Sequence, residues 1–138
     1  MTRVALPEGL RMQILTEAKA AFPRECCGLL EGVRNGADIR VTALHPARNL
    51  AAASDRFEIE PRDHIAAFKK ARANGHALIG CYHSHPGGAA EPSAADLAGA
   101  GEEGFLWLIA GKAALNAFVF AQGQFARAEL AGGGQAPL

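Results

Sequence analysis

The segment CYHSHPGGAAEPSAADL, residues 81–97, combines the end of a strand, a loop and a helix start within a short stretch. The apolar run 77–83 predicts a buried strand that leads directly into the polar part of the segment. A Gly/Ala loop follows, and Ser93 indicates the start of a short helix that extends toward Gly99. Ser93 and Asp96 make an S-x-x-D capping box at that helix start. The segment can therefore fold its polar residues back toward the end of the strand.

The polar residues of this segment have the spacing of metal ligands. His83 and His85 are two residues apart, so that on a strand both imidazoles point to the same side and can bind one zinc ion. Asp96 follows His85 after ten intervening residues, a loop long enough to bring its carboxylate to the same ion. Two histidines and one carboxylate leave the fourth tetrahedral position open to water, which is the arrangement of a catalytic zinc site. The spacing therefore predicts a zinc site.

Each part of the pattern also has an ordinary interpretation. A His-x-His pair at a strand end is often surface histidine, because imidazole serves many other roles. Ser93 and Asp96 alone would be explained by helix capping. A capping serine can still point its hydroxyl into a cleft, so capping and catalysis are compatible. The combination of all four residues favours the metal site.

Outside this segment, the apolar pattern predicts a single α/β domain with a mixed sheet flanked by about three helices. Helices are expected over 7–22 and from Pro61 to just before Gly75. Strands are expected at 26–34, around Ile39 and Val41, and at 56–60, 77–83, 105–110, 114–121 and 124–130. The domain is expected to cover 1–130, and the Gly-rich end, 131–138, is expected to be a flexible tail.

Two local patterns give finer expectations. Asn35-Gly36 is a strong signal for a two-residue hairpin turn between the first two of these strands. In the second helix, Ile65, Phe68 and Arg72, together with Ala71, are expected to mark the side that faces the sheet.

Composition narrows the range of partners. The chain has 138 residues, of which 49% are apolar and 20% charged, and its fourteen basic and fourteen acidic residues give a net charge of zero. No broad basic face is expected, so nucleic acid is excluded as a partner on electrostatic grounds. The longest apolar stretch, 105–120, is interrupted by polar residues and is too short to span a membrane. The N-terminus lacks the apolar core of a secretory signal.

The three cysteines indicate the redox environment. An odd number of cysteines without a framework spacing predicts free thiols in a reducing compartment, and hence a cytoplasmic protein. Cys26 and Cys27 are expected in the core, and Cys81, although it shares strand parity with His83, is more readily explained as a small buried hydrophobe.

The motif His83-Ser84-His85-Pro86, followed by Ser93 and Asp96, resembles the signature of the JAMM (MPN-plus) family of zinc metallopeptidases. The resemblance extends over nearly the whole chain to about Phe120 and is closest to the small bacterial branch. Its upstream part consists of Glu25 in PRECCGLLEG (23–32), Asn49, the run Phe57-Glu58-Ile59-Glu60-Pro61 and the lead-in Gly80-Cys81-Tyr82.

The resemblance implies a fold with a cytidine-deaminase-like outline and roles for the site residues. His83, His85 and Asp96 would bind one catalytic Zn²⁺. Glu25 would be the general base, and Ser93 would stabilise the developing oxyanion. Such a site needs one carboxylate that does not bind the ion, because the proton of the attacking water has to be taken up and returned.

The resemblance also implies a substrate class, a peptide or isopeptide bond after the C-terminal Gly-Gly of a ubiquitin-like protein. Small bacterial members are similar to enzymes that trim sulfur-carrier proteins, which is the leading expectation. The alternatives are the same chemistry on a bacterial ubiquitin-like conjugate or a cell-wall peptide, and a non-catalytic zinc-binding interaction module. A zinc deaminase is disfavoured because the H-x-E and P-C-x-x-C patterns are absent. A homodimer is an arrangement that the sequence leaves open.

The remaining histidines carry no spacing that suggests a site. His45, His64 and His76 fall at expected strand or helix ends and have no partner pattern, so they are expected to be surface histidines.

Overall fold

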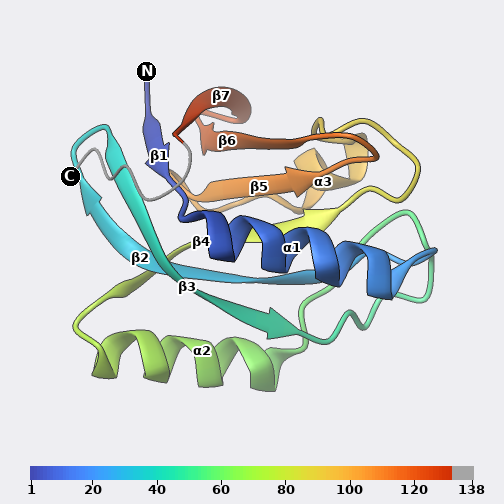
Figure 1. Ribbon diagram of the computed structural model, residues 1–138, viewed down its shortest axis with the longest axis horizontal. Coiled ribbons are helices and arrows are strands. Elements are labelled where there is room, and N and C mark those ends of the chain that lie inside the picture. Colours follow the sequence, from blue (N-terminus) through green and yellow to red (C-terminus); the bar gives the residue numbers. More distant parts are fainter. Residues whose placement is uncertain (132–138) are drawn as a thin grey trace.

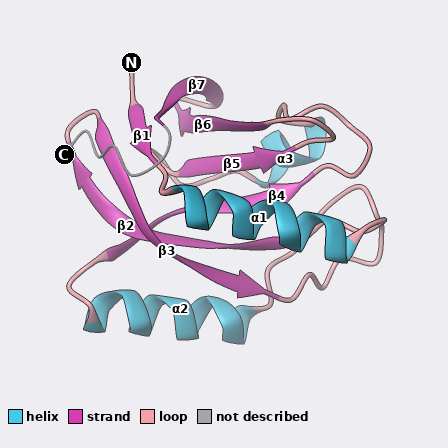
Figure 2. Cartoon of the chain, in the orientation of Figure 1, coloured by secondary structure: helices cyan, strands magenta, loops and turns pink. Residues whose placement is uncertain are grey.

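A seven-stranded sheet closes on itself in the computed structural model, which describes residues 1–131, and three helices pack against it (Figure 1). Helices and strands alternate along much of the chain (Figure 2). The elements are β1 (Arg3–Ala5), α1 (Glu8–Ala21), β2 (Cys27–Asn35), β3 (Asp38–Ala47), α2 (Pro61–Ala73), β4 (Ala77–Ser84), α3 (Ala94–Gly99), β5 (Leu106–Ala110), β6 (Leu115–Ala121) and β7 (Gln124–Ala131).

The strand order is β1-β3-β2-β4-β5-β6-β7, and β7 pairs back onto β1. The pairs β4–β5, β1–β3 and β1–β7 are parallel, whereas β2–β3, β2–β4, β5–β6 and β6–β7 are antiparallel. The predicted mixed sheet with about three helices is therefore confirmed, and closure into a barrel is an additional finding. The closing strand β1 is short, and the alternation of apolar residues did not predict it.

Both faces of the sheet are buried, and neighbouring residues of one strand serve different faces. Tyr82 belongs to the cluster covered by α1, whereas Cys81 belongs to the cluster covered by Ala67 of α2. A Cβ on Gly28 would lie 2.4 Å from the Tyr82 ring, so the glycine lets β2 and β4 carry that ring between them. The Tyr82 hydroxyl donates to Glu17 of α1 at 2.6 Å, which fixes α1 on its face.

The face of α2 that meets the sheet differs from the prediction. Ala67 and Ala71 are buried, whereas Ile65 is 56% and Phe68 52% exposed. The two alanines are one helical turn apart, and their small side chains allow the helix backbone to approach β2, β3 and β4 closely. The expectation that Ile65, Phe68 and Arg72 face the sheet was therefore wrong, although Ala71 was placed correctly.

Two other local expectations need correction. Residues 56–60 form no regular strand but a single bridge between Asn49 and Ile59. The hairpin turn consists of Gly36 and Ala37 rather than Asn35 and Gly36, because Asn35 is still paired with Asp38. Gly36 has φ +63°, and a glycine with positive φ at the first turn position is typical of a type II′ turn.

The helix boundaries and the other strands agree with the prediction to within one or two residues, except that β3 continues to Ala47, beyond the alternation expected around Ile39 and Val41. The predicted tail, 131–138, lies outside the described residues except for Ala131, which is the last residue of β7, and it stays a prediction. None of the helices in residues 1–131 has the length and apolar character needed to cross a bilayer.

Candidate metal centre

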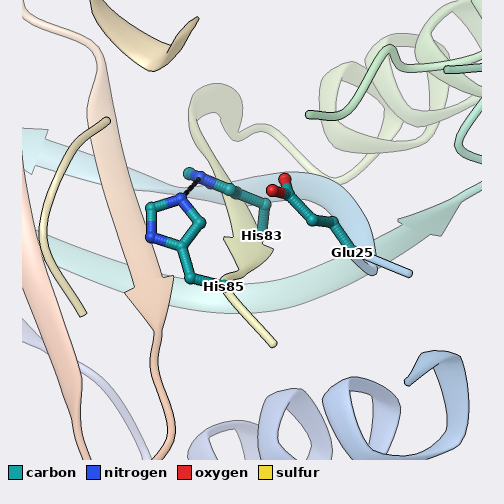
Figure 3. Close-up of side chains that lie close together, drawn as sticks. All are labelled: Glu25, His83 and His85. Carbon is teal, nitrogen blue, oxygen red and sulfur yellow. Dashed lines mark hydrogen bonds between the residues drawn. The ribbon is translucent and has the colours of Figure 1, made fainter. Parts of the chain in front are cut away.

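The predicted site residues converge at the carboxyl ends of the parallel strands β4 and β5. His83 lies near the end of β4, opposite Ile109 of β5, and His85 follows directly after the strand. Asp96 lies in the first turn of α3, and Glu25 lies just before β2. Three separate segments of the chain thus meet at one place, and Figure 3 shows the side chains of Glu25, His83 and His85 together.

Three ligand atoms point to a common spot. His83 Nε2 lies 2.9 Å from His85 Nε2 and 3.1 Å from Asp96 Oδ2. His85 Nε2 lies 3.1 Å from Asp96 Oδ2. The His83 and Asp96 side chains are 0% and 4% exposed, and that of His85 is 14% exposed. A small set of nitrogen and oxygen donors is therefore held together at the rim of the interior.

The protonation of these groups suits a cation. Burial lowers the pKa of His83, so its imidazole is neutral near pH 7. Burial alone would raise the pKa of Asp96, but hydrogen bonds to His83 and His85 outweigh it and hold that pKa well below its usual range. The hydrogen bond to Asp96 raises the pKa of His85, so a metal ion has to displace the proton from its Nε2. His85 Nδ1 donates to the Ala89 carbonyl at 3.1 Å, so the Nε2 lone pair then faces the site. Two imidazole nitrogens and one carboxylate fit a Zn²⁺ ion.

Glu25 is a fourth member of the centre with a different environment. One carboxylate oxygen lies within 4.8 Å of a ring nitrogen of both His83 and His85, and the residue is 4% exposed. Its Oε1 is buried without a hydrogen-bond partner among the described residues. Burial raises its pKa from 4.5 to about 7, with Asp96 adding to the rise and His85 opposing it. A carboxylate with this pKa can take up and release a proton near neutrality.

Ser93 caps α3 and lies beside the ligand set. Its Oγ accepts from the Asp96 N–H at 3.0 Å, and an Asp96 carboxylate oxygen accepts from the Ser93 N–H at 2.9 Å. The predicted capping box is therefore confirmed. Because Oγ acts as an acceptor in the cap, the hydroxyl hydrogen stays available to a ligand.

Two cavities flank the centre. One of about 300 Å³ borders Asp96 and has an apolar lining that includes Leu29, Phe57, Cys81, Phe105 and Trp107. The other, about 570 Å³, borders His85 on the α1 side of the molecule. The ligand set therefore borders a cavity on two sides.

Two aromatic rings and the Ser84 hydroxyl complete the centre, and the metal-ligand spacing in the sequence gave no role to them. The Phe57 ring stacks on His83 with centroids 4.4 Å apart, and Trp107 meets the same imidazole edge-on at 5.7 Å. The Ser84 Oγ accepts from the Cys26 N–H at 2.9 Å and so joins the strand end to the segment that carries Glu25. The family resemblance had drawn attention to Phe57, but only the structure supplies its contact.

The expectation for the cysteines is confirmed, whereas the expectation for two of the other histidines was wrong. Cys26, Cys27 and Cys81 are buried free thiols, as expected. His45 and His76 are not partnerless surface residues, because both bond to a buried glutamate. His45 Nε2 lies 2.8 Å from Glu31 Oε1 and His76 Nδ1 lies 2.6 Å from Glu31 Oε2. Their role depends on a glutamate far away in sequence, which a spacing rule cannot find.

Comparison with known proteins places this geometry in context. Residues 7–123 match the family of prokaryotic homologues of the JAB domain. The chain is 34% identical over 114 residues to the desampylase of Haloferax volcanii, a match that covers 78% of this chain and 80% of that protein.

Two solved structures extend the likeness. The solution structure of a Desulfitobacterium hafniense protein superposes with a TM-score of 0.87 at 30% identity, covering 97% of this chain and 95% of the other. A JAB1/MPN domain protein of Archaeoglobus fulgidus shares the fold, with a TM-score of 0.53 at 20% identity over 95% of this chain and 97% of the other.

Proposed function

The chain belongs to the prokaryotic JAB family of JAMM/MPN domains, and on this premise we propose that it is a zinc-dependent isopeptidase that releases a ubiquitin-like modifier. The bond cleaved is the one after the C-terminal Gly-Gly of the modifier. The observation that carries the proposal is the convergence of the His83, His85 and Asp96 donor atoms beside the buried carboxylate of Glu25.

Each side chain has a distinct part in the proposed reaction. His83, His85 and Asp96 would hold Zn²⁺, which when bound would supply a Lewis acid for the scissile carbonyl and lower the pKa of water to about 7. Glu25 takes a proton from the attacking water and passes it to the departing lysine or peptide amine. Ser93 donates its hydroxyl hydrogen to the carbonyl oxygen as negative charge develops there. The products are a modifier with a free carboxylate and an amine.

The similarity to a desampylase favours a ubiquitin-like protein as the substrate. We propose that this protein is a sulfur carrier, because exposing its terminal carboxylate prepares it for thiocarboxylation. The chain carries no long insertion near Asn49 or between α3 and β5 that could hold a second, folded modifier. A compact domain of this kind suits a substrate recognised mainly through its tail.

Intact-mass measurement of two substrates tests the proposal. One is a sulfur-carrier protein with residues beyond its Gly-Gly, and the other is the same carrier joined to a lysine side chain. Zinc-loaded protein is compared with chelated protein and with Glu25→Gln, and bound zinc is measured separately. Cleavage of both substrates by the zinc-loaded parent alone is the expected result. Cleavage of the conjugate alone would confine the activity to isopeptide bonds, and no cleavage of either by a zinc-bound protein would contradict the proposed substrate.

A further inference from the structure

The two histidines of the metal centre are oriented in different ways. His85 has its second ring nitrogen bonded to the Ala89 carbonyl. His83 has no such bond, because its Nδ1 is buried without a hydrogen-bond partner among the described residues. Most metal-binding histidines are held by a hydrogen bond from the second nitrogen. Apart from the contacts of its Nε2 with His85 and Asp96, the orientation of the His83 ring therefore depends on packing.

Aromatic contacts provide that packing. Phe57 lies nearly parallel to the His83 imidazole, with 4.4 Å between centroids and 26° between planes. Trp107 approaches the same ring at 88° and 5.7 Å. A stacked ring on one side and an edge contact limit rotation of the imidazole about its χ2 angle. Trp107 belongs to β5, whereas Phe57 lies in a segment without regular secondary structure.

Asn49 fixes the irregular segment that carries Phe57. Its Nδ2 donates to the carbonyl of Arg56 at 3.3 Å, and its Oδ1 accepts from the N–H of Glu58 at 2.9 Å. The residues immediately before and after Phe57 are therefore both held by one side chain. Oδ1 also accepts from the Ala51 N–H at 2.9 Å.

The same side chain reaches the proposed general base. Asn49 Nδ2 donates to the backbone carbonyl of Glu25 at 3.0 Å. With two donated and two accepted hydrogen bonds, the amide uses its full capacity. No other neutral side chain of this size carries two donors and two acceptor positions. One residue thus ties the ring support of His83 to the backbone of Glu25.

We propose that Asn49 and Phe57 are positioning residues of the metal centre. Phe57 holds the His83 imidazole with Nε2 toward the ion, and Asn49 holds both Phe57 and Glu25 in place. The proposal rests on the zinc centre proposed above. It gives a physical role to Asn49 and to the Phe57 run, which the family resemblance singled out without one.

Zinc affinity of Phe57 variants tests the stacking contact. Phe57→Leu keeps an apolar side chain but removes the ring, and it should weaken zinc binding about 10- to 100-fold, the range typical of lost support around a metal ligand. Phe57→Tyr keeps the ring and should bind zinc as the parent does. The affinities are measured by competition with a chromophoric chelator. Emission of Trp107, the single tryptophan of the chain, gives a second titration beside His83.

Phe125→Leu is the matched control for loss of a ring from the same aromatic cluster. Phe125 packs on Trp107 at 5.1 Å and should be replaceable with little effect on zinc affinity. Equal affinity of Phe57→Leu and the parent would overturn the stacking role, and so would equal weakening by Phe125→Leu. If the parent protein binds no zinc, the proposed metal centre is wrong. If the parent binds zinc but Phe57→Leu binds it equally well, the metal centre is retained and only the positioning role of Phe57 is wrong.

Asn49→Asp tests the link between the two parts. The carboxylate keeps the shape and both acceptors but cannot donate to the Glu25 and Arg56 carbonyls. We expect kcat to fall about 10- to 100-fold with little change in KM, together with weaker zinc binding. The added negative charge alone would strengthen cation binding, so weaker binding identifies lost positioning. Asn35→Asp, the same change at an exposed hairpin position, should leave kcat and zinc affinity unchanged. Parent-like kcat and zinc affinity in Asn49→Asp would overturn the proposal.

Discussion

Glu25 and Glu31 are both buried, and each lies beside two histidines, but their hydrogen bonding differs. Both oxygens of Glu31 are used: Oε1 bonds to His45, and Oε2 bonds to His76 and accepts from Asn74 at 3.0 Å. Glu25 has an oxygen without a partner among the described residues. Burial raises the pKa of both carboxyls, but at Glu31 the hydrogen bonds outweigh it and the pKa is lowered, whereas at Glu25 it rises to about 7.

The difference separates a cluster that stabilises the fold from one that can react. Glu31 joins β2 to β3, to the end of α2 and to the approach to β4, and a carboxylate with both oxygens in hydrogen bonds has little capacity left for a ligand. The Glu25 cluster leaves donor and acceptor capacity unused inside the protein, at a cost in stability. Residue types alone do not distinguish the two clusters, since both contain a glutamate and two histidines.

Removal of one histidine from each cluster should give the largest contrast. His83→Ala should weaken zinc binding by more than about 100-fold, since a ligand is lost rather than the support of a ligand, and activity should fall to background. His45→Ala should keep zinc and activity but lower the free energy of unfolding, because Glu31 Oε1 loses its partner. Chelator competition and denaturant unfolding measure the two effects. Zinc loss in His45→Ala would show that the two clusters are coupled.

The same substitution at the two glutamates should affect different properties, the catalytic rate at Glu25 and the stability at Glu31. Glu25→Gln should lower kcat about 10²- to 10⁴-fold while zinc stays bound, because the proposed general base is lost. Glu31→Gln should leave kcat unchanged and reduce the free energy of unfolding by about 1–3 kcal/mol, since an amide nitrogen cannot accept from His76 or His45. Single-turnover kinetics and urea unfolding of both variants make the comparison. A near-parental rate in Glu25→Gln would remove that residue from the mechanism.

Ser93 has a capping role and a proposed catalytic role that two substitutions can separate. Ser93→Ala and Ser93→Gly should both lower kcat about 10²- to 10³-fold, because the oxyanion donor is lost. Loss of the cap should cost about 1 kcal/mol of stability in the alanine variant and only a few tenths in the glycine variant. Thermal unfolding beside initial rates checks both effects. If kcat falls in the alanine variant but hardly at all in the more stable glycine variant, Ser93 acts only as a helix cap.

The smallest effect concerns the pH dependence of stability in the metal-free protein. Glu25 has a raised pKa, so between pH 4.5 and about 7 the folded state binds more protons than the unfolded state and stability falls as pH rises. Glu31 has a lowered pKa, so its contribution is present above the ordinary value of 4.5 and is lost as pH falls through the lower folded value. Glu25→Gln should remove a slope of at most about 1.4 kcal/mol per pH unit above pH 4.5.

Urea unfolding of chelated protein at several pH values measures these slopes. Glu31→Gln serves as the control, since it should flatten only the acidic limb of the curve. An unchanged slope above pH 4.5 in Glu25→Gln would mean that burial does not raise the Glu25 pKa as described.

Locally encoded features of the fold could be predicted from the sequence. The capping box of Ser93 and Asp96, the helix start at Pro61 and the apolar alternation of the longer strands depend on residues close together in the chain. The strand expected at 56–60 failed because a distant side chain, Asn49, takes hydrogen bonds that a neighbouring strand would otherwise make. Alternating apolar residues indicate which side chains can share a face of a sheet. They do not indicate which groups form hydrogen bonds with the backbone of the segment.

The sequence predicted which side chains gather at the candidate site but not the contacts that hold them there. The spacing of His83, His85 and Asp96 indicates zinc chemistry, whereas Glu25 came only from family resemblance. The Ala89 carbonyl that orients His85 carries no sequence signal, because every residue has a carbonyl. The outward-facing Ile65 of α2 likewise shows that apolar spacing does not fix which side of a helix meets the sheet when small residues allow closer packing elsewhere.

Closure of the barrel has a consequence for how the protein is made. β1 pairs in parallel with β7, so that Arg3 lies opposite Glu129, and its other partner is β3. During synthesis β1 leaves the ribosome long before β7, and the hairpin of β2 and β3 can form in between. The pairing that completes the ring must therefore wait until nearly all of the domain has been translated, and contacts between such distant residues form slowly. Until then β1 and β7 each lack one neighbour, which leaves unpaired strand edges on the nascent domain.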